Sequence, residues 1–286
     1  MKTIQKPAFS PTNSSARKNR QPDDAEKNTL RIHLILTILL AAVFALEITT
    51  FFAPLNLSDW LEALLILLAT ISTLAALARQ LPLQNVLLAA FVIAVVGGGI
   101  SALGARTGVP FGPLTFGSEA GQKIFKTLPL VIPLIWVVVI LNSRGTARLI
   151  LRPWRKTRTY GFWLMGFTAL LVLLFDLALE PFASHVKHYW LWMPTKFPLT
   201  WQGAPLVNFL SWAVVTLLIL AFVTPTLINK QLSKKGAPHY HPFGIWLGAI
   251  LLFGIAAATR ELWLAVIVDG IIAVVVAIFA IRGGRW

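Results

Sequence analysis

The sequence contains no cysteine in 286 residues, and only 13% of its residues are charged. Without cysteine there is no disulfide, no thiolate metal site and no cysteine nucleophile. So few charges, with 57% hydrophobic residues and a mean hydropathy of +0.74, exclude an ordinary soluble domain. The composition is instead typical of a protein that crosses a membrane several times.

Long apolar runs account for most of the chain. Each is close to the ~20 residues that a helix needs to cross a bilayer. They predict an all-α, polytopic integral membrane helix bundle of about eight transmembrane helices, which forms a single domain over residues 30–286. Residues 1–29 are polar and basic without an apolar period, and we expect a disordered cytoplasmic tail there. The predicted spans are 31–52, 60–79, 85–104, 126–143, 160–180, 205–228, 243–259 and 262–281.

The basic residues predict how the chain is oriented. If both termini are cytoplasmic, 19 of the 25 Lys and Arg lie on the cytoplasmic side, six of them in the loop Arg144–Arg158. This is the bias expected of a membrane protein. It explains the net charge of +14 without a nucleic-acid partner. For the loop Arg144–Arg158, a plain topology signal is favoured over the binding of anionic lipid head groups.

Acidic residues are scarce, and those in or beside a span all lie in its predicted outer half. A carboxylate in hydrocarbon costs about 2.5–3.5 kcal/mol even on lenient insertion scales, so such residues usually face a cavity, a partner or a proton path. Asp176 and Glu180 are one helical turn apart and share a helix face. We predict catalytic roles for these two, with Glu47 and Asp269 as further candidates. The acids interpreted as interfacial or capping groups are Asp59, Glu62 and Glu261.

Other motifs have structural explanations beside functional ones. His185 and His188 form H-x-x-H at the end of a helix without a third ligand, so we predict no metal site. His239 and His241 are expected to be solvated in a basic loop. The glycines of the third span, Gly97, Gly98, Gly99 and Gly104, favour close helix packing over a ligand groove.

Two blocks, residues 106–136 and 175–212, carry a specific resemblance. The first reads T-G-x-P-F-G and then P-x-x-I-P-x-x-W; the second has an acidic helix end with proline, then W-x-W and G-x-P-x-x-N-F-x-x-W. Together they resemble the carotenoid biosynthesis membrane protein family that includes bisanhydrobacterioruberin hydratase and γ-carotene hydratase. The chain departs from the family pattern at Ser101, where a Glu is expected, and at Leu114 and Phe116, where tyrosines are expected.

The resemblance implies addition of water to the terminal double bond of a linear carotenoid, without a redox cofactor, in a bacterial or archaeal cytoplasmic membrane. It also suggests association with other carotenoid enzymes. One carboxylic acid of the Asp176–Glu180 pair would protonate the alkene, the other would stabilise the cation, and Asn208 would hold the attacking water. Aromatic faces stabilise cations. The predicted substrate-binding residues are Phe111, Gly112, Trp136, Trp190, Trp192 and Trp212.

Three alternatives stay open at this stage. A carotenoid cyclase would use the same protonation but let the cation attack its own chain. A prenyltransferase would need a second acidic motif to hold Mg²⁺, and the sequence has none. A non-catalytic transport or scaffold protein is the third, and for it the tryptophans would form only an interfacial aromatic belt.

Overall fold

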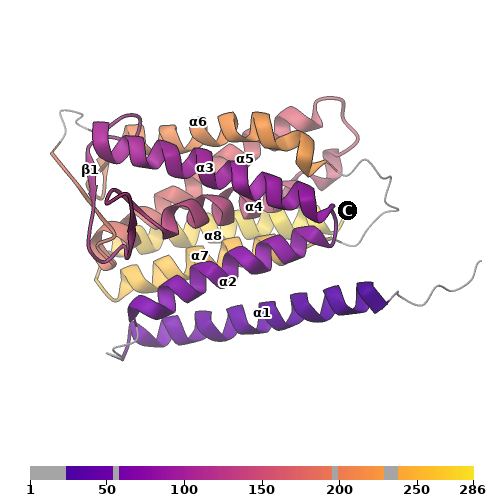
Figure 1. Cartoon of the computed structure of the whole chain (residues 1–286), viewed down its shortest axis with the longest axis horizontal. Helices are drawn as coiled ribbons and strands as arrows, with labels where there is room; N and C mark the ends of the chain where they lie inside the picture. The colour runs from indigo at the N-terminus through magenta and orange to yellow at the C-terminus, as the bar shows by residue number, and fades with distance from the viewer. Residues whose placement is uncertain (1–23, 54–57, 195–198, 229–237) are drawn as a thin grey trace, which may run out of the picture.

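The structure is a bundle of long helices that run side by side (Figure 1). The computed structural model describes residues 24–53, 58–194, 199–228 and 238–286, with side chains described from Asn28 in the first helix and from Leu61 in the second. Eight helices in this described part are long and apolar enough to cross a membrane, which confirms the all-α polytopic fold. They are α1 (Asp24–Thr50), α2 (Ser58–Ala78), α3 (Leu83–Thr107), α4 (Val131–Ile150), α5 (Tyr160–Pro181), α6 (Leu206–Val223), α7 (His241–Ala258) and α8 (Trp263–Gly284).

Helix α1 begins inside the segment predicted to be a tail, and the rest of that tail, residues 1–23, lies outside the described residues. The start of α1 and the end of α8 lie at the same end of the bundle, which we call the terminal end (Figure 1). The opposite end carries the short strands and is called the cap end.

Helix α4 occupies the centre, packed against α2, α3, α5, α7 and α8. Its position differs from the predicted span 126–143, because a hairpin of β2 (Lys123–Ile124) and β3 (Leu128–Pro129) precedes it. The helix also continues through Arg144 and Arg148, so the loop predicted from Arg144 was wrong at its start. Arg144 is buried, and its Nη2 lies 3.5 Å from the Leu227 carbonyl oxygen.

The cap end is built from the connection between α3 and α4 and the connection between α5 and α6, which pair with each other. Strand β1 (Leu114–Phe116) from the first loop pairs antiparallel with β4 (Trp190–Trp192) from the second. A short π-helical segment, η2 (Phe182–Val186), carries the chain from α5 toward β4, and a small hairpin of β5 (Thr200–Trp201) and β6 (Ala204–Pro205) leads into α6. The cap thereby ties the loop after α3 to the loop after α5.

The glycines of α3 confirm close helix packing at Gly97 and Gly98, which meet α4, and Gly104 packs closely against a cap residue. A Cβ on Gly97 would lie 2.4 Å from Trp136 Cγ, one on Gly98 would lie 2.9 Å from Pro133 Cγ, and one on Gly104 would lie 2.7 Å from Phe111 Cδ2. Gly99 meets nothing within 4 Å. Three of the four glycines thus let the bulky residues of α4 and the cap approach the α3 backbone.

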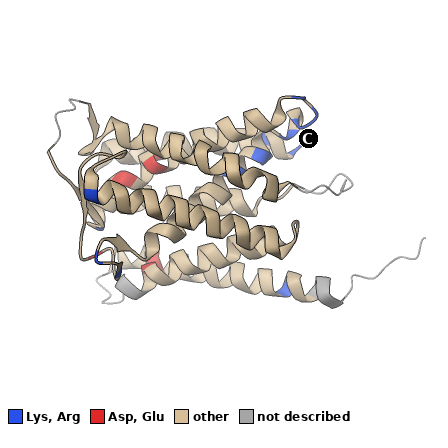
Figure 2. Ribbon diagram, turned by 45° about the horizontal axis from the view of Figure 1, so that its top comes forward, with Lys and Arg blue, Asp and Glu red and all other residues tan. Residues whose placement is uncertain are grey.

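Charges are segregated along the bundle axis (Figure 2). The acidic residues coloured in the ribbon lie toward the cap end, and most of the basic ones lie toward the terminal end. This distribution agrees with the charge bias in the sequence, and a cytoplasmic location of the terminal end stays a prediction.

Candidate active site

The acid pair of α5 lies buried in the cap half of the bundle. Asp176 and Glu180 have exposed fractions of 1% and 0%. Asn208, near the start of α6, donates from Nδ2 to Asp176 Oδ2 at 2.7 Å. Glu180 Oε1 accepts hydrogen bonds from the indole nitrogens of Trp190, at 2.9 Å, and Trp192. The second oxygen of each carboxyl group, Asp176 Oδ1 and Glu180 Oε2, has no hydrogen-bond partner among the described residues.

The W-x-W motif explains how two tryptophans reach one carboxylate. Residues i and i+2 of a strand point to the same face, and Trp190 and Trp192 are the first and last residues of β4. Pairing with β1 fixes that strand, with Trp190 opposite Phe116 and Trp192 opposite Leu114. The cap therefore holds both indole N–H groups over the end of α5.

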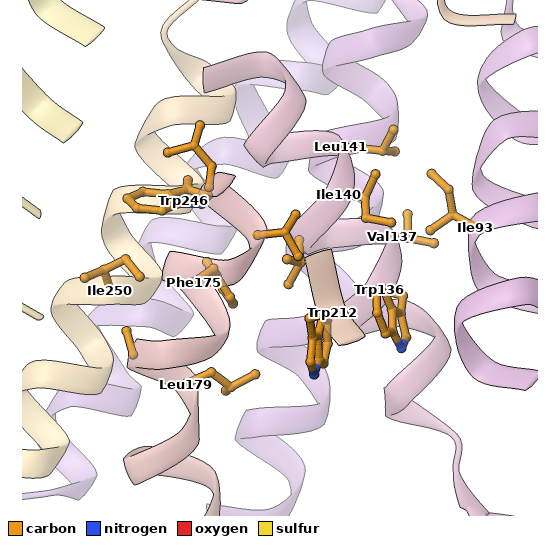
Figure 3. Close-up of a cluster of buried hydrophobic side chains, with 14 of the residues drawn as sticks. Ile93, Trp136, Val137, Ile140, Leu141, Phe175, Leu179, Trp212, Trp246 and Ile250 are labelled. Atoms are coloured by element: carbon orange, nitrogen blue, oxygen red, sulfur yellow. The ribbon is translucent and has the colours of Figure 1, made fainter. Parts of the chain in front are cut away.

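Two tryptophans stack on each other near the acid pair, and one of them, Trp212, lines the site (Figure 3). The rings of Trp136 on α4 and Trp212 on α6 have centroids 3.8 Å apart and an interplanar angle of 16°. Phe111 is tilted against both rings. Trp136 Nε1 donates to Ser101 Oγ at 2.9 Å, so Ser101, one of the departures from the family pattern, orients the stack.

Several of these groups line a small cavity of about 40 Å³. A water needs only about 10–15 Å³ of such space and two or more polar partners, so the cavity has room for water. Asn208 and Glu180 supply polar groups to a wall that is otherwise largely aromatic. The lining residues are Ser101, Phe111, Leu114, Phe116, Ile132, Ile135, Glu180, Trp190, Trp192, Asn208 and Trp212.

The structure thus brings together most of the residues predicted from the sequence. Two predicted substrate-binding residues lie behind the lining rather than in it. Trp136 stacks on Trp212, and Gly112 packs against the ring of Pro205, where a Cβ would lie 2.6 Å from Pro205 Cγ. Gly112 also has a φ of +108°, a conformation that favours glycine.

Glu47 lies elsewhere, in an ion-pair cluster that sequence reasoning missed. Lys187 Nζ donates to Glu47 Oε1 at 2.9 Å and also to Glu62, and the Tyr189 hydroxyl donates to Glu62 Oε2. Glu62, interpreted as an interfacial group, has a side chain that is only 13% exposed and bridges Lys187 and Tyr189 of the cap. Lys187 is 140 residues from Glu47 and 125 from Glu62. No local pattern predicts such a pairing; the one available signal was that all three lie near predicted outer span ends.

Comparisons with known proteins identify the family of the chain. The family model described as carotenoid biosynthesis protein matches residues 61–276, which is well over half of the chain. The chain belongs to the carotenoid biosynthesis protein family. A curated relative, the bisanhydrobacterioruberin hydratase of Haloarcula japonica, is 29% identical over 115 residues, which cover 40% of this chain and 36% of the relative. The match thus spans about a third of that relative. No solved structure matches the chain.

In this carotenoid biosynthesis protein the fourth acidic candidate, Asp269, is separate from both clusters. It lies on α8, is 2% exposed and faces Gly254 of α7, where a Cβ would be 3.5 Å from Asp269 Cβ. Neither carboxylate oxygen has a hydrogen-bond partner among the described residues. Asp269 is also absent from the lining of the small cavity.

The histidines of the H-x-x-H motif interact with backbone carbonyl oxygens. His185 Nε2 lies 2.9 Å from Gln202 O, and His188 Nδ1 lies 2.9 Å from Ser184 O. Within the described part of the chain, no group of three or more His, Cys, Asp or Glu is placed to hold a metal ion.

The histidines near the terminal end correct a prediction. His239 and His241, expected to be solvated, are half-buried, and His241 Nε2 lies 2.9 Å from Ser72 Oγ. The ring of His33 on α1 meets the His241 ring edge-on at 4.5 Å. Burial, together with the charges of His33, Arg79 and Arg148, lowers the pKa of His239 to about 4. His239 is therefore neutral at physiological pH.

Proposed function

We propose that this carotenoid biosynthesis protein is a hydratase that adds water to the terminal double bond of a linear carotenoid. One observation carries the proposal: two buried carboxyl groups lie one helical turn apart beside an aromatic cavity with room for water. Glu180 lines this cavity, and Asp176 is hydrogen-bonded to Asn208, which also lines it. Protonation of an alkene needs a strong proton donor and groups that stabilise the resulting cation. The acid pair and the aromatic rings would supply both.

The hydrogen bonds suggest a division of labour within the pair. Two indole N–H groups donate to Glu180, and donors of this kind favour an ionised carboxylate. Two carboxylates this close cannot readily both ionise in apolar surroundings. We therefore assign Asp176 as the protonated carboxylic acid and Glu180 as the ionised carboxylate.

The reaction then proceeds in two steps. Asp176 transfers its proton to the less substituted carbon of the terminal double bond, and the π electrons of that bond form the new C–H bond. The resulting tertiary cation is stabilised by the Glu180 carboxylate and by the faces of Trp190 and Trp212. Water held by Asn208 adds to the cation, and its extra proton returns to Asp176. The sum is one water added, with no electron acceptor required.

The space around the acid pair favours hydration over cyclisation. A cyclase must exclude water from its cation, whereas the 40 Å³ cavity has room for a water beside Asn208. The amide of Asn208 both donates to Asp176 and retains a carbonyl oxygen and a second N–H for a water molecule.

The test is pigment analysis in a bacterium engineered to make lycopene, with the chain expressed beside it. We expect a product heavier by one water with an unchanged chromophore, measured by liquid chromatography with mass and absorption spectra. Asp176→Asn should abolish the product while folded protein is retained. Glu119→Gln, which neutralises an exposed acid in the cap, is the matched control and should keep full activity.

Two results would contradict the proposal. An equal-mass product with a blue-shifted spectrum would establish a cyclase instead. Normal turnover by the Asp176→Asn variant would remove Asp176 from the mechanism.

A further inference from the structure

A second, much larger cavity lies among α1, α2, α4, α5 and α7. Its volume of about 390 Å³ falls in the range typical of small-molecule pockets. Phe175 and Leu179 of α5 line it, each one residue before a member of the acid pair, and Phe182 of η2 lines it beside them. Ile135 of α4 lines both this cavity and the small one, so the two cavities share a wall.

Two glycines of α7 help to create this space. Gly244 and Gly248 form a G-x-x-x-G pattern, which in membrane helices usually brings two helices into close contact. Here a Cβ on Gly248 would still be 3.7 Å from the Phe44 ring of α1, and one on Gly244 would meet nothing within 4 Å. Helix α1 packs mainly along α2 and only briefly against α7. The glycines therefore widen a cavity instead of closing an interface.

The polar groups at the cap end of this cavity are the cluster of Glu47, Glu62, Lys187 and Tyr189. Glu47, Glu62 and Tyr189 are part of the lining. Glu47 is fully buried, and its Oε2 has no hydrogen-bond partner among the described residues. A buried oxygen without a partner is costly, and a ligand donor would remove that cost.

The charge of the cluster selects among ligands. Two carboxylates face one ammonium group, so the cluster is net negative with one acceptor oxygen to spare. It would repel the phosphate of a prenyl diphosphate or the carboxylate of a fatty acid. A hydroxyl group can donate the hydrogen bond that Glu47 Oε2 lacks, and it carries no charge.

We propose that the large cavity is a second binding site, which takes a linear isoprenoid alcohol with its hydroxyl on Glu47 and its chain along Gly244 and Gly248. The choice of an isoprenoid over other lipid alcohols rests on the proposed function, since hydration yields a tertiary alcohol of this class. In this site the isoprenoid alcohol would lie on the opposite side of α5 from the acid pair.

Photolabelling tests the proposal separately from catalysis. The purified Asp176→Asn protein, in lipid nanodiscs, is exposed to a diazirine derivative of geranyllinalool, a linear isoprenoid tertiary alcohol, and to the matching hydrocarbon without the hydroxyl. Labelled peptides are mapped by mass spectrometry. We expect labels on α1 and α7, with the alcohol about tenfold more efficient than the hydrocarbon, the ratio that one charge-assisted hydrogen bond gives.

Variants localise the effect. Gly248→Leu fills the cavity and should lower labelling by both probes about tenfold. Gly270→Leu is the matched control: Gly270 is exposed on α8 with nothing within 4 Å of an added Cβ, and labelling should not change. Glu47→Gln should remove most of the preference for the alcohol while Lys187 keeps its bond to Glu62.

Equal labelling by the two probes, or labelling confined to other helices, would overturn the proposal and identify at most a space for lipid acyl chains. If Glu47→Gln does not fold, the two probes and the Gly248→Leu variant decide alone. Retained hydration by Asp176→Asn would count against the proposed function but would leave this labelling result intact.

Discussion

At the scale of single residues, the site depends on which hydrogen bonds each carboxyl group receives. Asp176 and Glu180 are alike in burial and lie four residues apart, yet one is bonded to an amide and the other to two indoles. The Asp176–Glu180 spacing and the W-x-W motif are both local, so the sequence predicts that these residues act together. The specific pairing of Glu180 with the tryptophans depends on the register of β4 with β1, which only the fold determines.

Trp192→Phe tests whether the indole N–H matters beyond the ring. We expect hydration to fall about tenfold or more, because a hydrogen bond to a charged group contributes about 1.5–3 kcal/mol. The measurement is the initial rate of product formation per folded protein. Trp201→Phe is the control, since Trp201 Nε1 donates to the Leu177 carbonyl and does not line the small cavity. Equal losses in both variants would contradict a specific role for Trp192.

At the scale of the elements, the α3–α4 contact positions the stacked tryptophans. Gly97→Ala should destabilise the protein by about 1–3 kcal/mol, because overpacking forces a shift of Trp136, whose ring lies 2.4 Å from the added Cβ. Gly99→Ala, two residues away on an open face, should be neutral or slightly stabilising. Thermal unfolding in detergent distinguishes them, and similar melting temperatures would argue against this packing.

The cluster around Lys187 joins the cap to α1 and α2. Lys187→Met would leave two largely buried carboxylates without their cation and should cost about 3–5 kcal/mol of stability. Lys126→Met, on the exposed surface of the cap, should cost little. The readout is the melting temperature at neutral pH, where a loss no larger than that of the control would contradict the assigned role.

The same cluster predicts a dependence of stability on alkaline pH. Burial acts to lower the pKa of Lys187, but Glu62 and Glu47 outweigh it and raise the pKa above its ordinary value of 10.5. A raised lysine pKa gives stability that is full below the ordinary value and is lost as pH rises through the folded-state value. The difference in melting temperature between wild type and Lys187→Met should therefore stay constant up to about pH 10 and shrink above 10.5. A constant difference throughout would contradict the ion pair.

Much of the element scale could be predicted, and the exceptions have physical causes. Apolar length predicts the helices because the bilayer imposes it. No local sequence pattern of this kind predicts which helices contact one another. Glu47 and Lys187 are far apart in sequence. The large cavity exists because α1 packs along α2 and contacts α7 only briefly. The predicted start of α4 was wrong because the residues before Val131 are apolar enough for a span but form the β2–β3 hairpin.

At the scale of the whole molecule, charge segregation predicts that the terminal end faces the cytoplasm. The absence of cysteine makes this directly testable, since any introduced thiol is unique. Thr159→Cys lies in an exposed turn at the terminal end and Ser118→Cys in an exposed loop of the cap. A membrane-impermeant maleimide added to intact cells should label only Ser118→Cys. Labelling of Thr159→Cys in intact cells would reverse the topology.

The placement of both cavities between membrane-spanning helices has a consequence for kinetics. For the proposed hydratase, the polyene substrate would enter from the bilayer. The concentration that governs its encounter with Asp176 would then be its mole fraction in the lipid, not its amount per volume of buffer. Adding empty lipid at constant total carotenoid should slow turnover in proportion to the dilution, while adding buffer should leave the rate per protein unchanged. Rate constants for the proposed hydratase should therefore be expressed relative to the mole fraction of carotenoid in the membrane.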